Sequence, residues 1–202
     1  MKVSVILAHP RKGSLNHAIA GTVTRALGEN GHTVVFHDLY AEGFDPVLPS
    51  GEIPRDAPLG PVIEAHCAEL AAAGGIVIVH PDWWGQPPAI LKGWVDRVLR
   101  PGVAYRFLES DGGEGIPVGL LVAKAALVLN TSNTPRMREI AAFGDPLERL
   151  WRDCIFSLCG VPAFHRRMFS VVVTSTEEER RRWLGEVRDM VKSIFPADSP
   201  EP

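Results

Sequence analysis

Apolar runs and segments with helical periodicity alternate along the chain. Five short runs are rich in Val, Ile and Leu without strict polar alternation, which is typical of parallel strands covered on both faces. These runs are Val3–Ala8, Thr33–His37, Ile76–His80, Ala125–Leu129 and Ser170–Val173. The segments between them repeat apolar residues at helical spacing. The pattern therefore predicts an α/β fold in which a doubly wound parallel sheet carries helices on both faces.

Three of the predicted helices have marked boundaries. Ser14 is placed to cap the start of the first, and Gly31 to end it. Pro87 and Pro88 stand near the first turn of another, where proline is tolerated. The apolar stripe of the last helix begins at Trp183, and the charged run before it predicts solvated opening turns.

Two stretches are dense in glycine and proline and predict long loops, Gly43–Pro61 and Gly102–Gly119. Long loops at the carboxyl ends of parallel strands commonly surround a ligand. The chain has no internal repeat and no linker that would divide it. We therefore expect a single domain over residues 1–195, followed by a C-terminal tail at 196–202.

Composition narrows the class of protein. The 202 residues are 46% hydrophobic and 22% charged, enough for a packed core, and the net charge of -3 disfavours a nucleic-acid partner. No apolar run reaches the ~20 residues that cross a bilayer, and the N-terminus lacks a secretory signal pattern. We expect a cytoplasmic protein without stable membrane insertion.

Several kinds of chemistry lack their sequence signals. Cys67, Cys154 and Cys159 form no CxxC pair and are expected to be core thiols. The seven histidines show neither HxH nor HExxH spacing, so no metal site is predicted. The GxSxG nucleophile elbow is also absent, which disfavours serine hydrolysis.

The turn after the first strand suits an anion. It lacks the GxGxxG pattern of dinucleotide sites but joins a strand to a helix start, where free N–H groups attract phosphate. Ser14 and Asn16 add polar side chains, Arg11 and Lys12 add positive charge, and His9 ends the strand. An ordinary helix cap with solvated basic residues explains the same pattern.

Two later turns complete a candidate site. Trp83 and Trp84 follow the third strand, and adjacent tryptophans cannot both face the core, so one is expected to line a crevice that takes a flat ring. After the fourth strand, the polar residues 130–134 offer amides and hydroxyls to the edge of such a ring. His80, at the end of the third strand, could equally be buried and hydrogen-bonded.

Together these turns resemble those of the flavodoxin-like NAD(P)H:quinone oxidoreductases (the DT-diaphorase-like family). The resemblance spans about residues 2–194. Its most specific mark is PAILKGW at 88–94, and the supporting marks are AHP at 8–10, SLN at 14–16, DLY at 38–40, FDPV at 44–47, GVAY at 102–105 and FGD at 143–145.

The resemblance implies a flavodoxin-like sheet with strand order 2-1-3-4-5 and a flavin at the three turns. The residues that match the family's cofactor-binding positions are His9, Ser14, Leu15, Asn16, Pro81, Asp82, Trp83, Trp84, Gly85, Thr131, Ser132, Asn133 and Thr134. The space over the ring would be lined by Trp84 and Phe143, with Tyr105 and Phe107 supplied by the partner subunit of a homodimer.

It also implies a two-electron reaction in which hydride passes from NAD(P)H to the flavin and then to a quinone-like acceptor by a ping-pong cycle. FAD is the expected cofactor, with FMN as the alternative, and the choice between NADH and NADPH stays open. No side-chain acid or base is strictly required. Two other readings are a regulatory flavin-binding subunit of a potassium efflux transporter and a one-electron flavodoxin-type carrier.

The chain departs from the family pattern at the flavin. Gly85 stands where many members have an aromatic residue, and Asn133 and Thr134 stand where many have two glycines. Of the tyrosine and histidine proposed to stabilise the reduced flavin in mammalian-type members, Phe143 occupies the histidine's place and the tyrosine has no match. Another donor, such as a loop N–H group or Asn133, is therefore expected to take that role.

Overall fold

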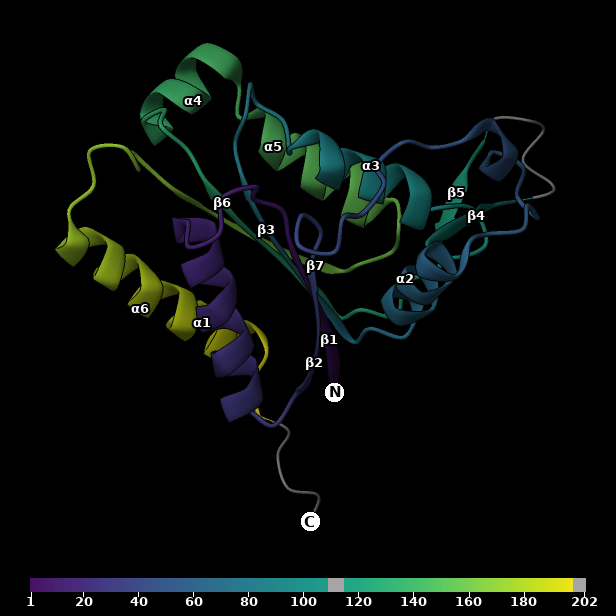
Figure 1. Cartoon of the computed structure of the whole chain (residues 1–202), viewed down its shortest axis with the longest axis horizontal. Coiled ribbons are helices and arrows are strands. Elements are labelled where there is room, and N and C mark those ends of the chain that lie inside the picture. The colour runs from purple at the N-terminus through teal and green to yellow at the C-terminus, as the bar shows by residue number, and fades with distance from the viewer. Residues whose placement is uncertain (109–114, 198–202) are drawn as a thin grey trace.

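A five-stranded parallel sheet forms the centre of the molecule (Figure 1). The computed structural model describes residues 1–108 and 115–197. The strand order is β2-β1-β3-β6-β7, which is 2-1-3-4-5 when only the strands of this sheet are numbered, so the predicted fold class is confirmed. The strands are β1 (Lys2–Leu7), β2 (Thr33–Asp38), β3 (Gly75–Pro81), β6 (Ala125–Thr131) and β7 (Ala163–Phe169).

Helices cover both faces of this sheet. One face carries α1 (Leu15–Glu29) and α6 (Glu177–Ile194), which pack against each other. The other carries α2 (Pro61–Ala71), α3 (Ala89–Val98), α5 (Pro146–Arg149) and a π-helical segment, η2 (Leu150–Ser157). A further helix, α4 (Arg136–Phe143), follows the carboxyl end of β6.

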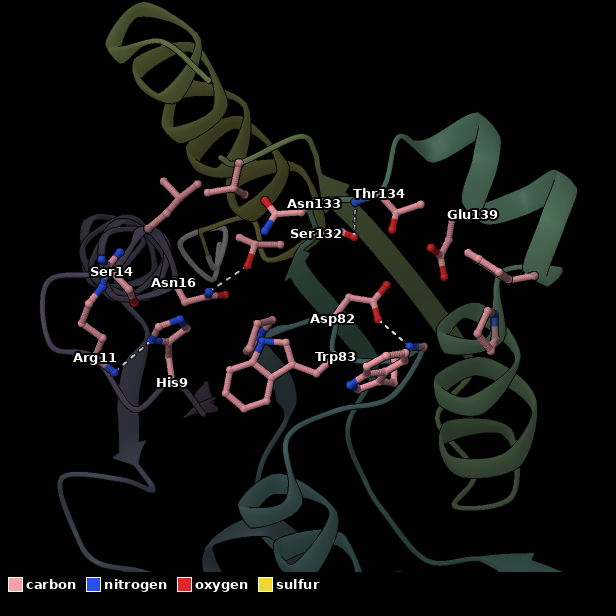
Figure 2. Close-up of a pocket in the computed structure, with 18 residues that line it drawn as sticks. His9, Arg11, Ser14, Asn16, Asp82, Trp83, Ser132, Asn133, Thr134 and Glu139 are labelled. Atoms are coloured by element: carbon pink, nitrogen blue, oxygen red, sulfur yellow. Dashed lines mark hydrogen bonds between the residues drawn. The ribbon is translucent and has the colours of Figure 1, made fainter. Parts of the chain in front are cut away.

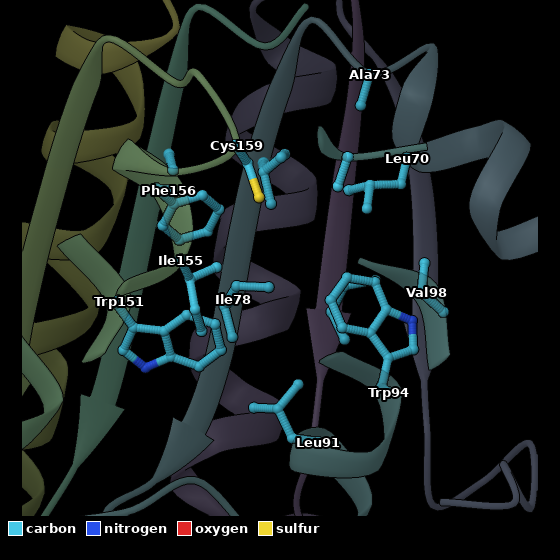
Figure 3. Close-up of a cluster of buried hydrophobic side chains, with 14 of the residues drawn as sticks. Leu70, Ala73, Ile78, Leu91, Trp94, Val98, Trp151, Ile155, Phe156 and Cys159 are labelled. Atoms are coloured by element: carbon cyan, nitrogen blue, oxygen red, sulfur yellow. The ribbon is translucent and has the colours of Figure 1, made fainter. Parts of the chain in front are cut away.

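Each face has its own hydrophobic core, because successive strand residues point to opposite sides. In β3, Ile76 and Ile78 belong to the core under α2, α3 and η2, whereas Val77 and Val79 belong to the core under α1 and α6. Figure 3 shows the first of these cores, in which Trp94 and Trp151 pack with aliphatic side chains. Burial on both sides explains why β3 is apolar throughout.

The helix boundaries follow the predicted signals. Ser14 caps α1 and accepts a hydrogen bond from the His17 N–H, as predicted. Gly31, just past the end of α1, has a left-handed φ of 79°. The charged run that precedes Trp183 forms the exposed first turns of α6, whose capping residue is Thr176.

The predicted fifth strand is wrong in position. The strand is Ala163–Phe169, and residues 170–173 lie in the loop that follows it. The sequence AFHRRMF lacks an apolar run because β7 is an edge strand, and Arg166 and Arg167 use their side chains for ion pairs with neighbouring elements. Val172, predicted to be a strand residue, lines the pocket described below.

Both predicted long loops contain regular structure. The first includes a short 3-10 helix, η1 (Ser50–Glu52), and ends where α2 begins. The second forms an antiparallel hairpin of β4 (Tyr105–Phe107) and β5 (Pro117–Gly119); most of its glycine cluster at 112–115 lies outside the described residues, as does most of the predicted tail. Cys67 and Cys159 are buried as expected, but Cys154 is exposed.

Gly93 explains part of the PAILKGW motif. A Cβ atom at Gly93 would lie 2.2 Å from the carbonyl oxygen of Pro46, so no larger side chain fits between α3 and this segment. The same contact lets Arg97 reach across, where its guanidinium donates to the Asp45 carbonyl oxygen at 2.6 Å and pairs with the Glu52 carboxylate. The motif thus fixes α3 against the loop that follows β2.

The two ends of the described chain meet at the amino-terminal edge of the sheet. The buried ring of His32 lies between the Met1 amino group, 3.3 Å from Nδ1, and the Phe195 carbonyl oxygen, 3.1 Å from Nε2. Asn30 Nδ2 donates to the same carbonyl oxygen at 2.7 Å. Within residues 1–108 and 115–197, no helix is long and apolar enough to cross a membrane.

Candidate functional site

A pocket of about 670 Å³ opens at the carboxyl edge of the sheet (Figure 2). It lies where β1 and β3 send their connections to opposite faces, the topological switch point at which open α/β sheets bind ligands. Every residue predicted to bind the cofactor lines it, together with Phe143. The structure therefore brings the three turns together, and their binding of a cofactor stays a prediction.

Four lining residues lie outside the predicted set: Arg11, Glu139, Pro146 and Val172. Arg11 was marked in the sequence only as a nearby charge. Tyr105 and Phe107 do not line the pocket of their own chain, because they belong to the β4–β5 hairpin. Their predicted role over the ring can be filled only in the pocket of another subunit.

The α1 end of the pocket is built to receive an anion. Free N–H groups at the start of α1 carry partial positive charge, and the Arg11 side chain lines the same end. His9 Nδ1 accepts a hydrogen bond from the Arg11 backbone N–H at 3.1 Å, and burial lowers the pKa of His9. In the neutral ring the proton then sits on Nε2, which leaves His9 an additional donor.

Asn16 joins the first turn to the turn after β6. Its side chain is buried, and Nδ2 donates to Thr131 Oγ1 at 2.8 Å. Its Oδ1 has no hydrogen-bond partner among the described residues. An unsatisfied buried acceptor costs about 1–3 kcal/mol. The pocket therefore favours a ligand, or a water molecule, that donates to this oxygen.

The turn after β3 presents two tryptophans to the pocket. Trp83 and Gln86 exchange both backbone hydrogen bonds, at 3.0 and 3.1 Å, so Trp84 and Gly85 form a tight reversal. Both have left-handed backbone angles, φ 59° and φ 69°, and the Gly85 N–H donates to Asp82 Oδ1 at 2.9 Å. The Trp84 side chain is fully exposed and Trp83 is 42% exposed, so both tryptophans line the crevice, where one was predicted.

The turn after β6 forms the side of the pocket opposite the tryptophans. Ser132 is buried, and its Oγ accepts from the Thr134 N–H at 3.0 Å. Asn133 Oδ1 accepts from the Val173 N–H at 3.0 Å, which ties this turn to the loop after β7. Both side-chain oxygens are thus engaged in hydrogen bonds within the protein.

The α4 end of the pocket is acidic. Asp82 and the buried Glu139 both line it, and Figure 2 shows Glu139 reaching from α4 toward the side on which Asp82 lies. Burial raises the pKa of both carboxyl groups. Behind them, the buried Arg166 guanidinium donates to Asp145 Oδ1 at 2.7 Å and Glu148 Oε2 at 3.2 Å.

His80 lies beneath the pocket and is completely buried, as one of the two sequence alternatives held. Its Nδ1 donates to the Pro81 carbonyl oxygen at 2.8 Å, and its Nε2 accepts from Trp151 Nε1 at 3.1 Å. Burial lowers the pKa of His80 to about 4. The ring is therefore neutral near pH 7, and both of its nitrogens serve the structure.

A cluster of His37, Glu42 and His66 lies between β2 and α2, and their ligand atoms fall within 4.8 Å of one another. Its hydrogen bonds argue against a metal. Trp94 Nε1 donates to His66 Nδ1 at 3.1 Å, so the neutral ring carries its proton on Nε2, the nitrogen that faces Glu42. A metal-bound histidine instead donates from its other nitrogen. The expectation of no metal stays a prediction.

Comparisons with known proteins agree with this architecture. The profile of a family described by its flavodoxin-like fold matches residues 1–189. An uncharacterized NAD(P)H oxidoreductase of Haemophilus influenzae is 33% identical over 183 residues, covering 88% of this chain and 87% of that protein. A ribosyldihydronicotinamide dehydrogenase [quinone] of Mus musculus is 29% identical over 221 residues, covering 96% and 92%. The crystal structure of Smu.1420 from Streptococcus mutans superposes with a TM-score of 0.84 at 30% identity, covering 96% of this chain and all of the other.

Proposed function

Because this chain belongs to the flavodoxin-like NAD(P)H:quinone oxidoreductase family, we propose that it reduces quinones with NAD(P)H by means of a bound flavin. The observation that carries the proposal is the pocket at the switch point of the sheet. One end of this pocket is a helix start suited to an anion, and beside it lies a crevice lined by tryptophan side chains. Residues of three separate turns line the pocket. A phosphate-bearing planar ring fits that combination.

The residues present fit a flavin at each end of the pocket. Ser14, Leu15 and Asn16 would bind its phosphate with the free N–H groups of α1, and the buried Asn16 Oδ1 supplies an acceptor that lacks a partner. The turns at 81–85 and 131–134 would hold the ring. When bound, a flavin supplies two-electron chemistry, accepting hydride from a nicotinamide and reducing a quinone.

The chain's own part in the reaction is to align two flat substrates and keep water away from them. The exposed indole of Trp84 and the half-exposed Phe143 offer apolar surface beside the pocket. A nicotinamide and then a quinone would use the same space in turn, which is the ping-pong order. Asp82 and Glu139 face this space from the α4 end.

A homodimer would complete the pocket. On the β4–β5 hairpin the rings of Tyr105 and Phe107 pack edge to face, with their centroids 5.4 Å apart. Phe107 is half-exposed. Leu108 and Ile116 add exposed apolar surface beside them. We expect this hairpin to reach the pocket of the partner subunit, and a cytoplasmic location stays a prediction.

The proposal is tested with the purified protein. We expect a yellow protein whose oxidised flavin absorption is lost within seconds when NADPH or NADH is added without oxygen, and restored by a quinone. Mass measurement of the flavin released by heat separates FAD, which we propose from the PAILKGW resemblance, from FMN. A protein that stays colourless after incubation with FAD, FMN and riboflavin would overturn the proposal.

A further inference from the structure

Glu139 is a buried carboxylic acid at the edge of the pocket with an unused oxygen. Glu139 is only 2% exposed, yet it lines the pocket together with Asp82. Its Oε1 has no hydrogen-bond partner among the described residues. A buried carboxyl group is normally satisfied by ion pairs or hydrogen bonds, so this oxygen lacks the partner that burial calls for.

The charges around Glu139 do not balance if every carboxyl group is ionised. The groups that face it are Asp82 after β3, Asp145 at the start of α5 and Arg166 on β7. The single positive charge of Arg166 is shared among several groups: Nη1 donates to Asp145 and Glu148 and Nε to Asn130, while the buried Nη2 has no hydrogen-bond partner among the described residues. Among the described residues, neither Asp82 nor Glu139 has an ion pair of its own. Glu139 is buried and Asp82 half-buried, and two neighbouring carboxyl groups repel each other when both are ionised, which favours a proton on one of them.

Geometry decides which group holds that proton. Asp82 Oδ1 accepts the Gly85 N–H at 2.9 Å, and a donated hydrogen bond stabilises a carboxylate. Glu139 has no backbone donor of this kind in the described part of the chain. Burial raises the pKa of both carboxyl groups, and at Asp82 the hydrogen bond from the Gly85 N–H opposes that rise. Glu139 is therefore the acid of the pair and Asp82 the carboxylate.

The reaction named above requires one such proton. Reduction of a quinone by NAD(P)H transfers two electrons and one proton as hydride, and the hydroquinone formed carries a second proton that the nicotinamide does not supply. A side-chain acid that lines the pocket can deliver this proton directly to the bound quinone. In the lining, the carboxyl group placed to hold such a proton is that of Glu139, whose buried Oε1 has no hydrogen-bond partner among the described residues.

We propose that Glu139 is the general acid of quinone reduction. Its O–H bond breaks as an O–H bond forms on a quinone oxygen, while the two electrons and the other proton come from NAD(P)H. The product is a hydroquinone, and Asp82 and Glu139 are left as two carboxylates beside Arg166 until Glu139 takes a proton from water. This inference rests on the proposed function, and it replaces the expectation that no side-chain acid is needed.

The test separates the two half-reactions in protein loaded with flavin. Glu139→Gln keeps the size of the side chain and removes the transferable proton. We expect reduction by NADPH to be unchanged and reoxidation by a simple benzoquinone to be about a hundredfold slower, with loss of its solvent deuterium isotope effect. The matched control is Glu186→Gln, which removes a carboxylate that pairs with Arg167, does not line the pocket and should leave both steps unchanged.

A second measurement does not depend on turnover. Infrared difference spectra of the flavin-free protein at neutral pH should show a protonated carboxyl band that Glu139→Gln removes and Glu186→Gln retains. Asp82→Asn can still accept the Gly85 N–H, but it removes the negative neighbour. The pKa of Glu139 should fall, so this band and the quinone step should both be lost at a lower pH than in the unaltered chain.

The outcomes distinguish the two proposals. Absence of flavin reduction by either nicotinamide would overturn the proposed function. Normal reduction by NADPH, combined with a quinone step that Glu139→Gln leaves unchanged, would overturn only the role of Glu139. Absence of the carboxyl band from the unaltered protein would likewise contradict the proton on Glu139.

Discussion

The two ends of the pocket have opposite electrostatic character although they lie along one edge of one sheet. At the α1 end, free N–H groups and Arg11 favour an anion, whereas at the α4 end Asp82 and Glu139 crowd two carboxyl groups together. A phosphate-bearing ligand would be attracted to one end and repelled from the other, and this difference would fix its direction in the pocket. The acidic end would then face the reacting part of the ligand, as the proposed role of Glu139 requires.

The largest effect is expected from reversing the charge at the α1 end. Ser14→Asp keeps a side chain that caps α1 but places a carboxylate where a phosphate would bind. Two like charges about 4 Å apart repel by roughly 4 kcal/mol at an effective dielectric constant of 20. We therefore expect flavin binding to weaken about a thousandfold, measured by titration of flavin fluorescence.

Ser14→Asn is the matched control, since asparagine caps a helix equally well without a charge. It should bind flavin within about tenfold of the unaltered chain. Equal weakening by both substitutions would show that the hydroxyl group itself, and not the charge at this end, governs binding.

Two buried histidines, His80 beneath the pocket and His66 on α2, should make the stability of the protein sensitive to acid. Burial lowers the pKa of His80 to about 4, and that of the buried His66 to about 4 as well, from an unfolded value of 6.5. The folded protein thus binds fewer protons than the unfolded chain, and its stability falls as the pH drops from 6.5 toward 4. The loss should reach about 3 kcal/mol for each histidine, measured by urea unfolding across this range.

His80→Gln keeps an acceptor for Trp151 and removes one of these titrations, so its stability should depend less steeply on pH. The two carboxyl groups act in the opposite sense. Because the pKa of Asp82 and of Glu139 is raised, the folded state holds their proton longer, and their effect is a loss of stability as pH rises. An NMR signal of His80 that titrates near pH 6.5 would contradict the predicted loss of stability in acid.

The smallest effect concerns the tight turn between the two ends. Trp84 has a left-handed φ of 59°, a backbone conformation that costs a side-chain-bearing residue about 1 kcal/mol. Trp84→Gly should stabilise the flavin-free protein by about 1 kcal/mol in urea unfolding while raising the KM for quinone. A variant that gained stability with an unchanged KM would show that the indole has no part in the substrate space.

Sequence reasoning placed most of the sheet and the three turns correctly because both depend on local pattern. Strands buried on both faces must be apolar, as β3 is, and the turns follow directly from those strands. It failed at β7, whose Arg166 faces partners on α5 and the preceding turn, because an edge strand can carry polar side chains that long-range ion pairs satisfy.

Glu139 was missed for a related reason. It follows Arg136 and Arg138, a charged pattern typical of an exposed helix, and its burial arises only when α4 folds beside Asp82, which lies 57 residues earlier in the sequence (139 − 82). An acidic residue close after the polar turn at 130–134 is the only local signal. The β4–β5 hairpin was missed because its three-residue strands are too short for a periodic pattern.

The position of His32 has a practical consequence. This ring pins the first residue of the chain to Phe195, at the edge of the sheet opposite the pocket, and Figure 1 shows the N-terminus at that end. A tether joined to Met1 would leave the pocket facing solution. The protein could therefore be attached in one orientation to an electrode or a bead, with the pocket opening toward solution. Acylation of the Met1 amino group would weaken its contact with His32 at the point of attachment.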